Sequence, residues 1–180
     1  MATASAIKTT VERAVKAMQD RPAIAEATIR NSAHLDDGLG CACTEGDWRL
    51  DLDLPKSIGG EHNGPTPGVY VRSALTACIA MGIKLFACRY DVPVEAVDVD
   101  LTVEADFRAD FGIGDVPPGY KSFAVEISVT SSADPAIVEK LVADSLACSP
   151  LLALHVSPQT VDVNVTVTPA TAEIAVSENG

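Results

Sequence analysis

The sequence has 180 residues, of which 47% are hydrophobic and 21% charged, and its net charge at pH 7 is −12. This length suits one well-buried domain, and the composition is that of an ordinary globular protein. Acidic residues outnumber basic ones by 25 to 13 and no run of Lys or Arg occurs, so the chain lacks the positive surface that nucleic acid or an anionic membrane requires.

The N-terminal residues and the cysteines indicate in which cellular compartment the protein is expected. The first twenty residues carry several charges and no hydrophobic stretch, so we expect no secretory signal. The longest uncharged apolar run, 73–83, is far shorter than the roughly 20 residues of a membrane-spanning helix. An odd number of cysteines, five, favours free thiols in a reducing environment. We therefore expect a soluble, cytoplasmic protein without a membrane partner.

The N-terminal half is predicted to contain one short helix and two strands. Apolar residues at helical spacing predict an amphipathic helix over 5–19. Alternating patterns then predict one strand within 24–35 and a second within 38–55, with Asp36-Asp37-Gly38 as the hairpin between them. Residues 55–68 form a loop by composition.

A long apolar helix is predicted next. Thr66 is a suitable N-cap, and Pro67 suits the first helical position because its missing N–H costs nothing there. The helix should run to about Tyr90, since Pro93 prevents much further extension. Few of its residues are charged, so it should form the core of the protein.

The C-terminal half alternates strands with one helix. Strands are predicted within 94–107, over 122–131 and over 161–167. Asp134 as N-cap and Pro135 at the first position predict a helix that ends before Pro150. The element order predicts an α+β fold with antiparallel sheet and buried helices. We expect one domain over 1–180, with a helical extension over 1–22 and a polar tail over 169–180.

Three of the five cysteines are interpreted as packing residues. Cys41 and Cys43 share one face of a predicted strand, but no second pair at ligand spacing accompanies them, so a zinc site is not favoured. Cys88 lies on the long helix with Cys78 and is also interpreted as packing. The histidines His34, His62 and His155 show no metal-ligand spacing. His62 and His155 are candidates for a base or cation near a thiol, although a surface or satisfied polar role is favoured. No nucleotide-binding motif is present.

Cys78 and Cys148 are the candidates for chemistry. A peroxidatic pair needs one thiolate to attack the O–O bond and a second thiol to condense with the resulting sulfenic acid. The thiolate needs a nearby cation or helix dipole. Seventy residues separate the two, so only tertiary folding can bring them together. On spacing alone, two inert core thiols remain the favoured interpretation.

Three stretches of the sequence favour a reactive pair over two inert thiols. IGGEHNGPTPGVYVRSALTACIAMG (58–82), VPPGYKSFAVEISV (116–129) and LACSPLLALH (146–155) together resemble the OsmC/Ohr family of osmotically inducible and organic-hydroperoxide-resistance proteins. The match extends roughly from 26 to 168. Its most specific parts are G-P-T-P with a cysteine about a dozen residues later, and the later Cys-x-Pro at 148–150.

The resemblance implies an OsmC-like α+β fold in which antiparallel sheets wrap around long buried helices of an intertwined homodimer. The family's peroxidatic cysteine matches Cys78 and its resolving cysteine matches Cys148. Family members reduce organic hydroperoxides with an external dithiol reductant and use no metal or bound cofactor. The implied partners are therefore a second copy, a small hydroperoxide and a dithiol.

The sequence departs from the family at two activating positions. Where peroxidase members carry a glutamate after the proline that begins the helix, this chain has Gly68 and Val69, and the first hairpin offers Asp36 and Asp37 instead of an arginine. The substitutes to consider are Arg30, Arg49 and Arg72. Arg72 lies about 120° around the helix from Cys78, so we expect it to point outward and not to act on Cys78 of the same chain.

Two functions therefore remain open. The leading hypothesis is a thiol-dependent peroxidase for organic or lipid hydroperoxides with a role in oxidative stress defence. The alternative is a non-catalytic OsmC-fold protein that binds a small molecule or senses redox state, having lost the activating Arg and Glu.

Overall fold

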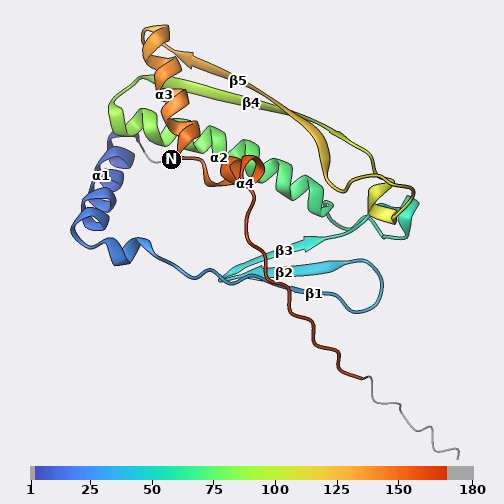
Figure 1. Cartoon of the computed structure of the whole chain (residues 1–180). Helices are drawn as coiled ribbons and strands as arrows, with labels where there is room; N and C mark the ends of the chain where they lie inside the picture. The colour runs from blue at the N-terminus through green and yellow to red at the C-terminus, as the bar shows by residue number, and fades with distance from the viewer. Residues whose placement is uncertain (1–2, 170–180) are drawn as a thin grey trace, which may run out of the picture.

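The computed structural model describes residues 3–169 and shows a mixed α+β fold arranged around one long helix (Figure 1). The first element, α1 (Ala4–Asp20), confirms the predicted N-terminal helix and is followed by the short 3₁₀ helix η1 (Pro22–Ala25). Lys8 of α1 forms an ion pair with Asp91 at the end of the long helix. The N-terminal extension is thereby attached to the core helix.

A three-stranded antiparallel sheet follows, made of β1 (Ser32–His34), β2 (Cys41–Glu45) and β3 (Trp48–Leu52) in that order. The prediction of a single strand within 38–55 was wrong, because a two-residue turn divides it. Glu45 pairs with Trp48 across this turn, and Gly46 has φ +56°, a conformation that glycine adopts without strain. Apolar residues alternate on both sides of the turn, so the sequence pattern did not reveal where the turn lies.

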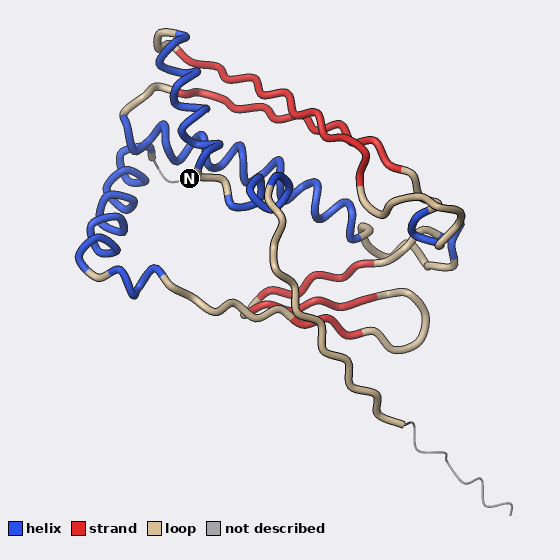
Figure 2. The backbone as a smooth tube through the Cα atoms, in the orientation of Figure 1, coloured by secondary structure: helices blue, strands red, loops and turns tan. Residues whose placement is uncertain are grey.

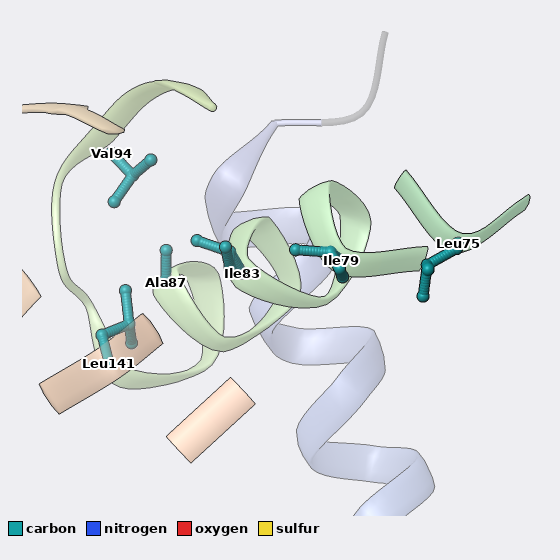
Figure 3. Packing of buried hydrophobic residues seen from close by; sticks show 6 residues of the cluster. All are labelled: Leu75, Ile79, Ile83, Ala87, Val94 and Leu141. Atoms are coloured by element: carbon teal, nitrogen blue, oxygen red, sulfur yellow. The ribbon is translucent and has the colours of Figure 1, made fainter. Parts of the chain in front are cut away.

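The long helix α2 (Pro67–Tyr90) confirms the prediction at both ends, with Thr66 as N-cap. Leu75, Ile79, Ile83 and Ala87 recur every fourth residue and therefore form one stripe along the helix. All four are almost completely buried. Figure 3 shows this stripe packed with Val94 and Leu141, which come from the following strand and helix.

The strands β4 (Val94–Ala105) and β5 (Tyr120–Ser131) pair antiparallel and confirm the two strands predicted there. Figure 2 shows this ribbon running along α2, and its alternating apolar residues lie against that helix. The loop between the strands contains the 3₁₀ helix η3 (Ala109–Phe111), and η2 (Lys56–Ile58) lies in the loop before α2.

Two helices complete the described structure. α3 (Pro135–Ala147) confirms the prediction, and its N-cap Asp134 accepts a hydrogen bond from the backbone N–H of Ala136 at 2.9 Å. The sequence analysis missed α4 (Pro150–Val156), which begins two residues after Cys148. Pro150 ends one helix and occupies the first position of the next, so the same residue serves both roles.

The predicted closing strand over 161–167 was wrong for the single chain. These residues lie in an extended segment with no strand partner among residues 3–169. Val161, Val163, Val165 and Val167 are 77–84% exposed. Alternation predicts an extended segment with two unlike faces, but a strand also requires an edge to pair with, and that edge is a non-local property.

By length and composition alone, α2 could cross a membrane. This is weak evidence, since the core helix of a soluble protein passes the same test. The helix packs against α1, β4, α3 and α4 within the described chain, so its apolar character is explained in part by these contacts.

Candidate functional site

Cys78 lies in the middle of α2 and is half-buried. Its Sγ atom is 3.6 Å from Oγ of Ser149, a residue 71 positions later in the chain. Ser149 is 8% exposed and is the N-cap of α4, where its hydroxyl accepts a hydrogen bond from the N–H of Leu152. The fold therefore brings the start of α4 directly onto the Cys78 thiol.

Cys148 is the residue immediately before Ser149 and ends α3. Its side chain is exposed, and both Cys78 and Cys148 are free thiols. The structure therefore brings together the two chain segments that carry the predicted pair, while Ser149 makes the polar contact with Cys78.

Arg72 does not point outward as the sequence analysis expected. It is half-buried, and its Nη1 donates a hydrogen bond to the hydroxyl of Tyr120 at 2.8 Å. The long side chain bends back along α2, and a Cβ atom at Gly68 would lie 2.9 Å from Nη1. A helical wheel gives the direction in which a side chain leaves the helix, but not the path of the rotatable bonds of a long arginine side chain.

This orientation excludes Arg72 as the group that holds the Cys78 sulfur as an anion within one chain. The guanidinium lies at the level of Gly68, ten positions before Cys78, which corresponds to about 15 Å along the helix. A cation must lie within about 4–6 Å of an anion to stabilise it strongly. The expectation that Arg72 has no such role in the same chain is consistent with this geometry.

The other candidate cations lie elsewhere in the described structure. Arg49 forms an ion pair with Asp51 on the sheet, and Arg30 is exposed before β1. His62 is exposed in the loop before α2. His155 on α4 contacts the carbonyl of Leu151 through Nδ1. For the Cys78 sulfur, the polar contact recorded within residues 3–169 is the one with Ser149.

Asp53 organises the loop before α2, a role that the sequence analysis missed. Its carboxylate is 3% exposed and accepts hydrogen bonds from the N–H groups of Leu54, Glu61 and Asn63. The bond from Asn63 is the main cause of a lowered pKa at Asp53, against burial, which raises it. An aspartate that ends an alternating strand before a glycine-rich loop is the pattern that could have indicated this role.

The remaining cysteines lie away from this site. Cys88 is buried in α2, as predicted for a packing residue. Cys41 and Cys43 are half-buried on the apolar face of the three-stranded sheet, and burial followed by the neighbouring Cys41 raises the pKa of Cys43. Within residues 3–169 no group of three or more metal-ligating side chains is assembled.

Comparison with solved structures agrees with the fold. The chain resembles the OsmC-like protein from Mycoplasma pneumoniae with a TM-score of 0.57 at 14% identity, over 71% of this chain and 86% of that one. A Psychrobacter arcticus 273-4 protein, described as an osmotic stress induced and detoxification response protein, gives 0.54 at 13% identity, over 71% and 88%. At such identities the likeness shows the fold alone.

No curated protein sequence matches the chain significantly. The sequence does match the family of OsmC-like proteins over residues 60–170, which is more than half of its length. This range contains α2 with Cys78, the strands β4 and β5, and the Cys148-Ser149-Pro150 segment. The chain therefore belongs to the OsmC-like protein family.

Proposed function

We propose that the chain is a thiol-dependent peroxidase that reduces organic or lipid hydroperoxides and serves in oxidative stress defence. The observation that carries this proposal is the 3.6 Å contact between the half-buried Cys78 sulfur and Ser149, the neighbour of Cys148. A reactive thiol on a core helix and a second thiol from a distant segment are the two parts that such chemistry needs.

The reaction proceeds in two steps. The Cys78 thiolate attacks the distal oxygen of the hydroperoxide, the O–O bond breaks, and the alkoxide leaves as an alcohol after protonation. Cys78 is then a sulfenic acid, which condenses with the Cys148 thiol to form a disulfide and one water. An external dithiol reduces this disulfide by thiol–disulfide exchange and is itself oxidised. The Ser149 hydroxyl can donate a hydrogen bond to the attacking sulfur, which favours the thiolate.

The position of Cys148 suits the second step. It is adjacent to Ser149, so its Cα lies about 3.8 Å from that of a residue already in contact with Cys78. Its exposed side chain must turn inward, and the junction between α3 and α4 is where this change occurs. Exposure also leaves the thiol accessible to the external reductant.

We also propose that the working form is a homodimer, and the surface of the chain supports this. The single chain exposes 14,011 Å², whereas a compact monomer of 18.7 kDa exposes about 8,300 Å². The extended segment 157–169 accounts for part of this difference. On α2, a second stripe of exposed apolar residues lies beside Cys78 and consists of Ala74, Ala77, Met81 and Leu85.

The test of the peroxidase proposal is consumption of cumene hydroperoxide with dithiothreitol as the reductant. Wild type should consume the hydroperoxide catalytically, and Cys78→Ser should be inactive. Cys148→Ser should consume one equivalent of hydroperoxide and then stop. Cys41→Ser is the matched control, because this half-buried thiol lies on the sheet and should be dispensable. Absence of turnover by wild type, or full activity in Cys78→Ser, would refute the proposal.

The second candidate is a non-catalytic protein that binds a small molecule or senses redox state. It is favoured by Gly68 and Val69 where the family carries a glutamate, and by the position of the Arg72 guanidinium at the level of Gly68, about 15 Å along the helix from Cys78. The pH dependence of Cys78 alkylation distinguishes the two. A thiol that alkylates rapidly below pH 7 fits the peroxidase, and one that alkylates only in alkaline solution fits the binding protein.

A further inference from the structure

Ser149 occupies the position from which a side chain reaches the Cys78 sulfur. Its Oγ atom lies 3.6 Å from that sulfur, and Ser149 is 8% exposed. The side chain of the neighbouring Cys148 is exposed instead. The junction between α3 and α4 therefore presents the serine to Cys78 and leaves the cysteine, which would resolve an oxidised Cys78, in contact with solvent.

Hydrogen bonds from both helices hold Ser149 in this orientation. Its N–H donates to the carbonyl of Leu146 at 3.1 Å, at the end of α3. Its carbonyl accepts from the N–H of Ala153 at 3.0 Å, and its hydroxyl accepts from the N–H of Leu152 at 3.3 Å, both in α4. Turning Cys148 inward requires the backbone at the junction to rotate, which breaks several of these bonds. The resolving thiol can therefore reach Cys78 only after the junction has opened.

The Ser149 hydroxyl can act on Cys78 before and after oxidation. Because its oxygen accepts from the N–H of Leu152, its own proton is free to be donated to the sulfur. Once the sulfur carries an oxygen as a sulfenic acid, the same hydroxyl lies beside that group, whose oxygen accepts hydrogen bonds. A serine cannot condense with a sulfenic acid to a disulfide. The contact therefore stabilises the oxidised cysteine without consuming it.

We propose that Ser149 is a catalytic residue that prolongs the lifetime of the Cys78 sulfenic acid by keeping Cys148 away from it. The proposal rests on the proposed function and concerns the regulation of the same site. One hydroperoxide converts the Cys78 thiolate into the sulfenic acid and leaves as the alcohol. The junction then opens, and condensation with the Cys148 thiol gives a disulfide and one water. Opening of the junction is the slow step of disulfide formation.

The delay makes the site sensitive to the amount of hydroperoxide. While Cys148 points away, a second hydroperoxide can oxidise the sulfenic acid to a sulfinic acid and leave as a second alcohol. An external dithiol does not reduce a sulfinic acid, so the site is then inactivated. Wild type should therefore lose activity progressively in excess hydroperoxide, and a variant whose junction opens faster should resist this loss.

Dimedone added at successive times after one equivalent of cumene hydroperoxide, without reductant, follows the two steps by intact mass. Wild type should first give the dimedone adduct of Cys78 and only later the disulfide. Ser149→Ala should form the disulfide about twofold to thirtyfold faster, because it loses the N-cap of α4 and the contact with Cys78. Ser149→Thr keeps a hydroxyl and a suitable N-cap, so it should behave like wild type. Equal or slower disulfide formation in Ser149→Ala would overturn the role of Ser149 alone, whereas the absence of any oxidised Cys78 in wild type would refute the peroxidase.

A second experiment tests the position of Ser149 without hydroperoxide. Oxidised glutathione converts two protein thiols into a disulfide and is reduced to two molecules of glutathione. In Ser149→Cys the new thiol lies beside Cys78, so their disulfide should form at least about tenfold faster than the Cys78–Cys148 disulfide of wild type. Ser145→Cys is the matched control and should give no such gain, because Ser145 is also buried but its Oγ faces Gly82, about one helical turn from Cys78. Equal rates in Ser149→Cys and wild type would overturn the proposal whether or not the protein reduces hydroperoxides.

Discussion

Met81→Glu tests whether the second apolar stripe of α2 is an interface between two copies. Met81 is 72% exposed in the single chain, so a glutamate there should change the stability of a monomer by less than about 0.5 kcal/mol, since Glu favours helix. If a second copy covers the stripe, the substitution removes roughly 1.5–3 kcal/mol of apolar burial. It also desolvates a carboxylate, at a cost of several kcal/mol more.

The effect on assembly should therefore be large. A loss of at least about 3–4 kcal/mol raises the dissociation constant by at least roughly two to three orders of magnitude, and a two-fold interface contains the substitution twice. Sedimentation equilibrium at micromolar concentration should show a dimer for wild type and a monomer for Met81→Glu. Ile83→Ala is the control: it removes a fully buried side chain and lowers the melting temperature, but should keep the dimer mass. A dimeric Met81→Glu, or a monomeric wild type, would refute the interface.

Two further predictions concern the loop before α2. In Gly60→Ala the new Cβ would lie 1.9 Å from the carbonyl oxygen of Leu54, so we expect a loss of about 1–3 kcal/mol in urea denaturation, whereas Gly40→Ala, with no atom within 4 Å, should be nearly neutral. The pKa of Asp53 is lowered in the folded state, so its ionised carboxylate stabilises the fold above the ordinary aspartate pKa of 3.8. This stabilisation is lost as the pH falls below that value. The urea midpoint of wild type should therefore fall as the pH is lowered below 3.8. Asp53→Asn should be less stable than wild type at pH 7, and its urea midpoint should change less at acid pH. An equal change in the two proteins would contradict this role of Asp53.

The elements that the sequence predicted well are those whose signals are local. Thr66 with Pro67, and Asp134 with Pro135, mark the beginnings of α2 and α3 within two residues, and the structure confirms both. The alternation over 94–107 likewise predicts β4, because the period of a half-buried strand is a property of the segment itself. Caps and periodicity need no knowledge of the rest of the fold.

The predictions that were wrong depend on something outside the segment. The turn at Gly46 was missed because apolar residues alternate on both sides of it. The segment 161–167 has the pattern of a strand and no partner within the described chain. For the site, the resemblance identified Cys78 and Cys148, but the contact of Cys78 with Ser149 and the bending of Arg72 toward Tyr120 depend on packing between distant elements.

The position of Cys78 connects the assembly to the chemistry. The thiol is adjacent to Ala77 and lies at helical spacing from Ala74 and Met81, so a partner that covers these residues also covers the approach to the sulfur. We propose that the second copy then supplies the cation that residues 3–169 of one chain do not place beside Cys78. Peroxidase activity should therefore follow the fraction of dimer as the protein is diluted, and Met81→Glu should lose activity and dimer mass together. Full activity in a monomeric Met81→Glu would show that one chain alone activates its thiol.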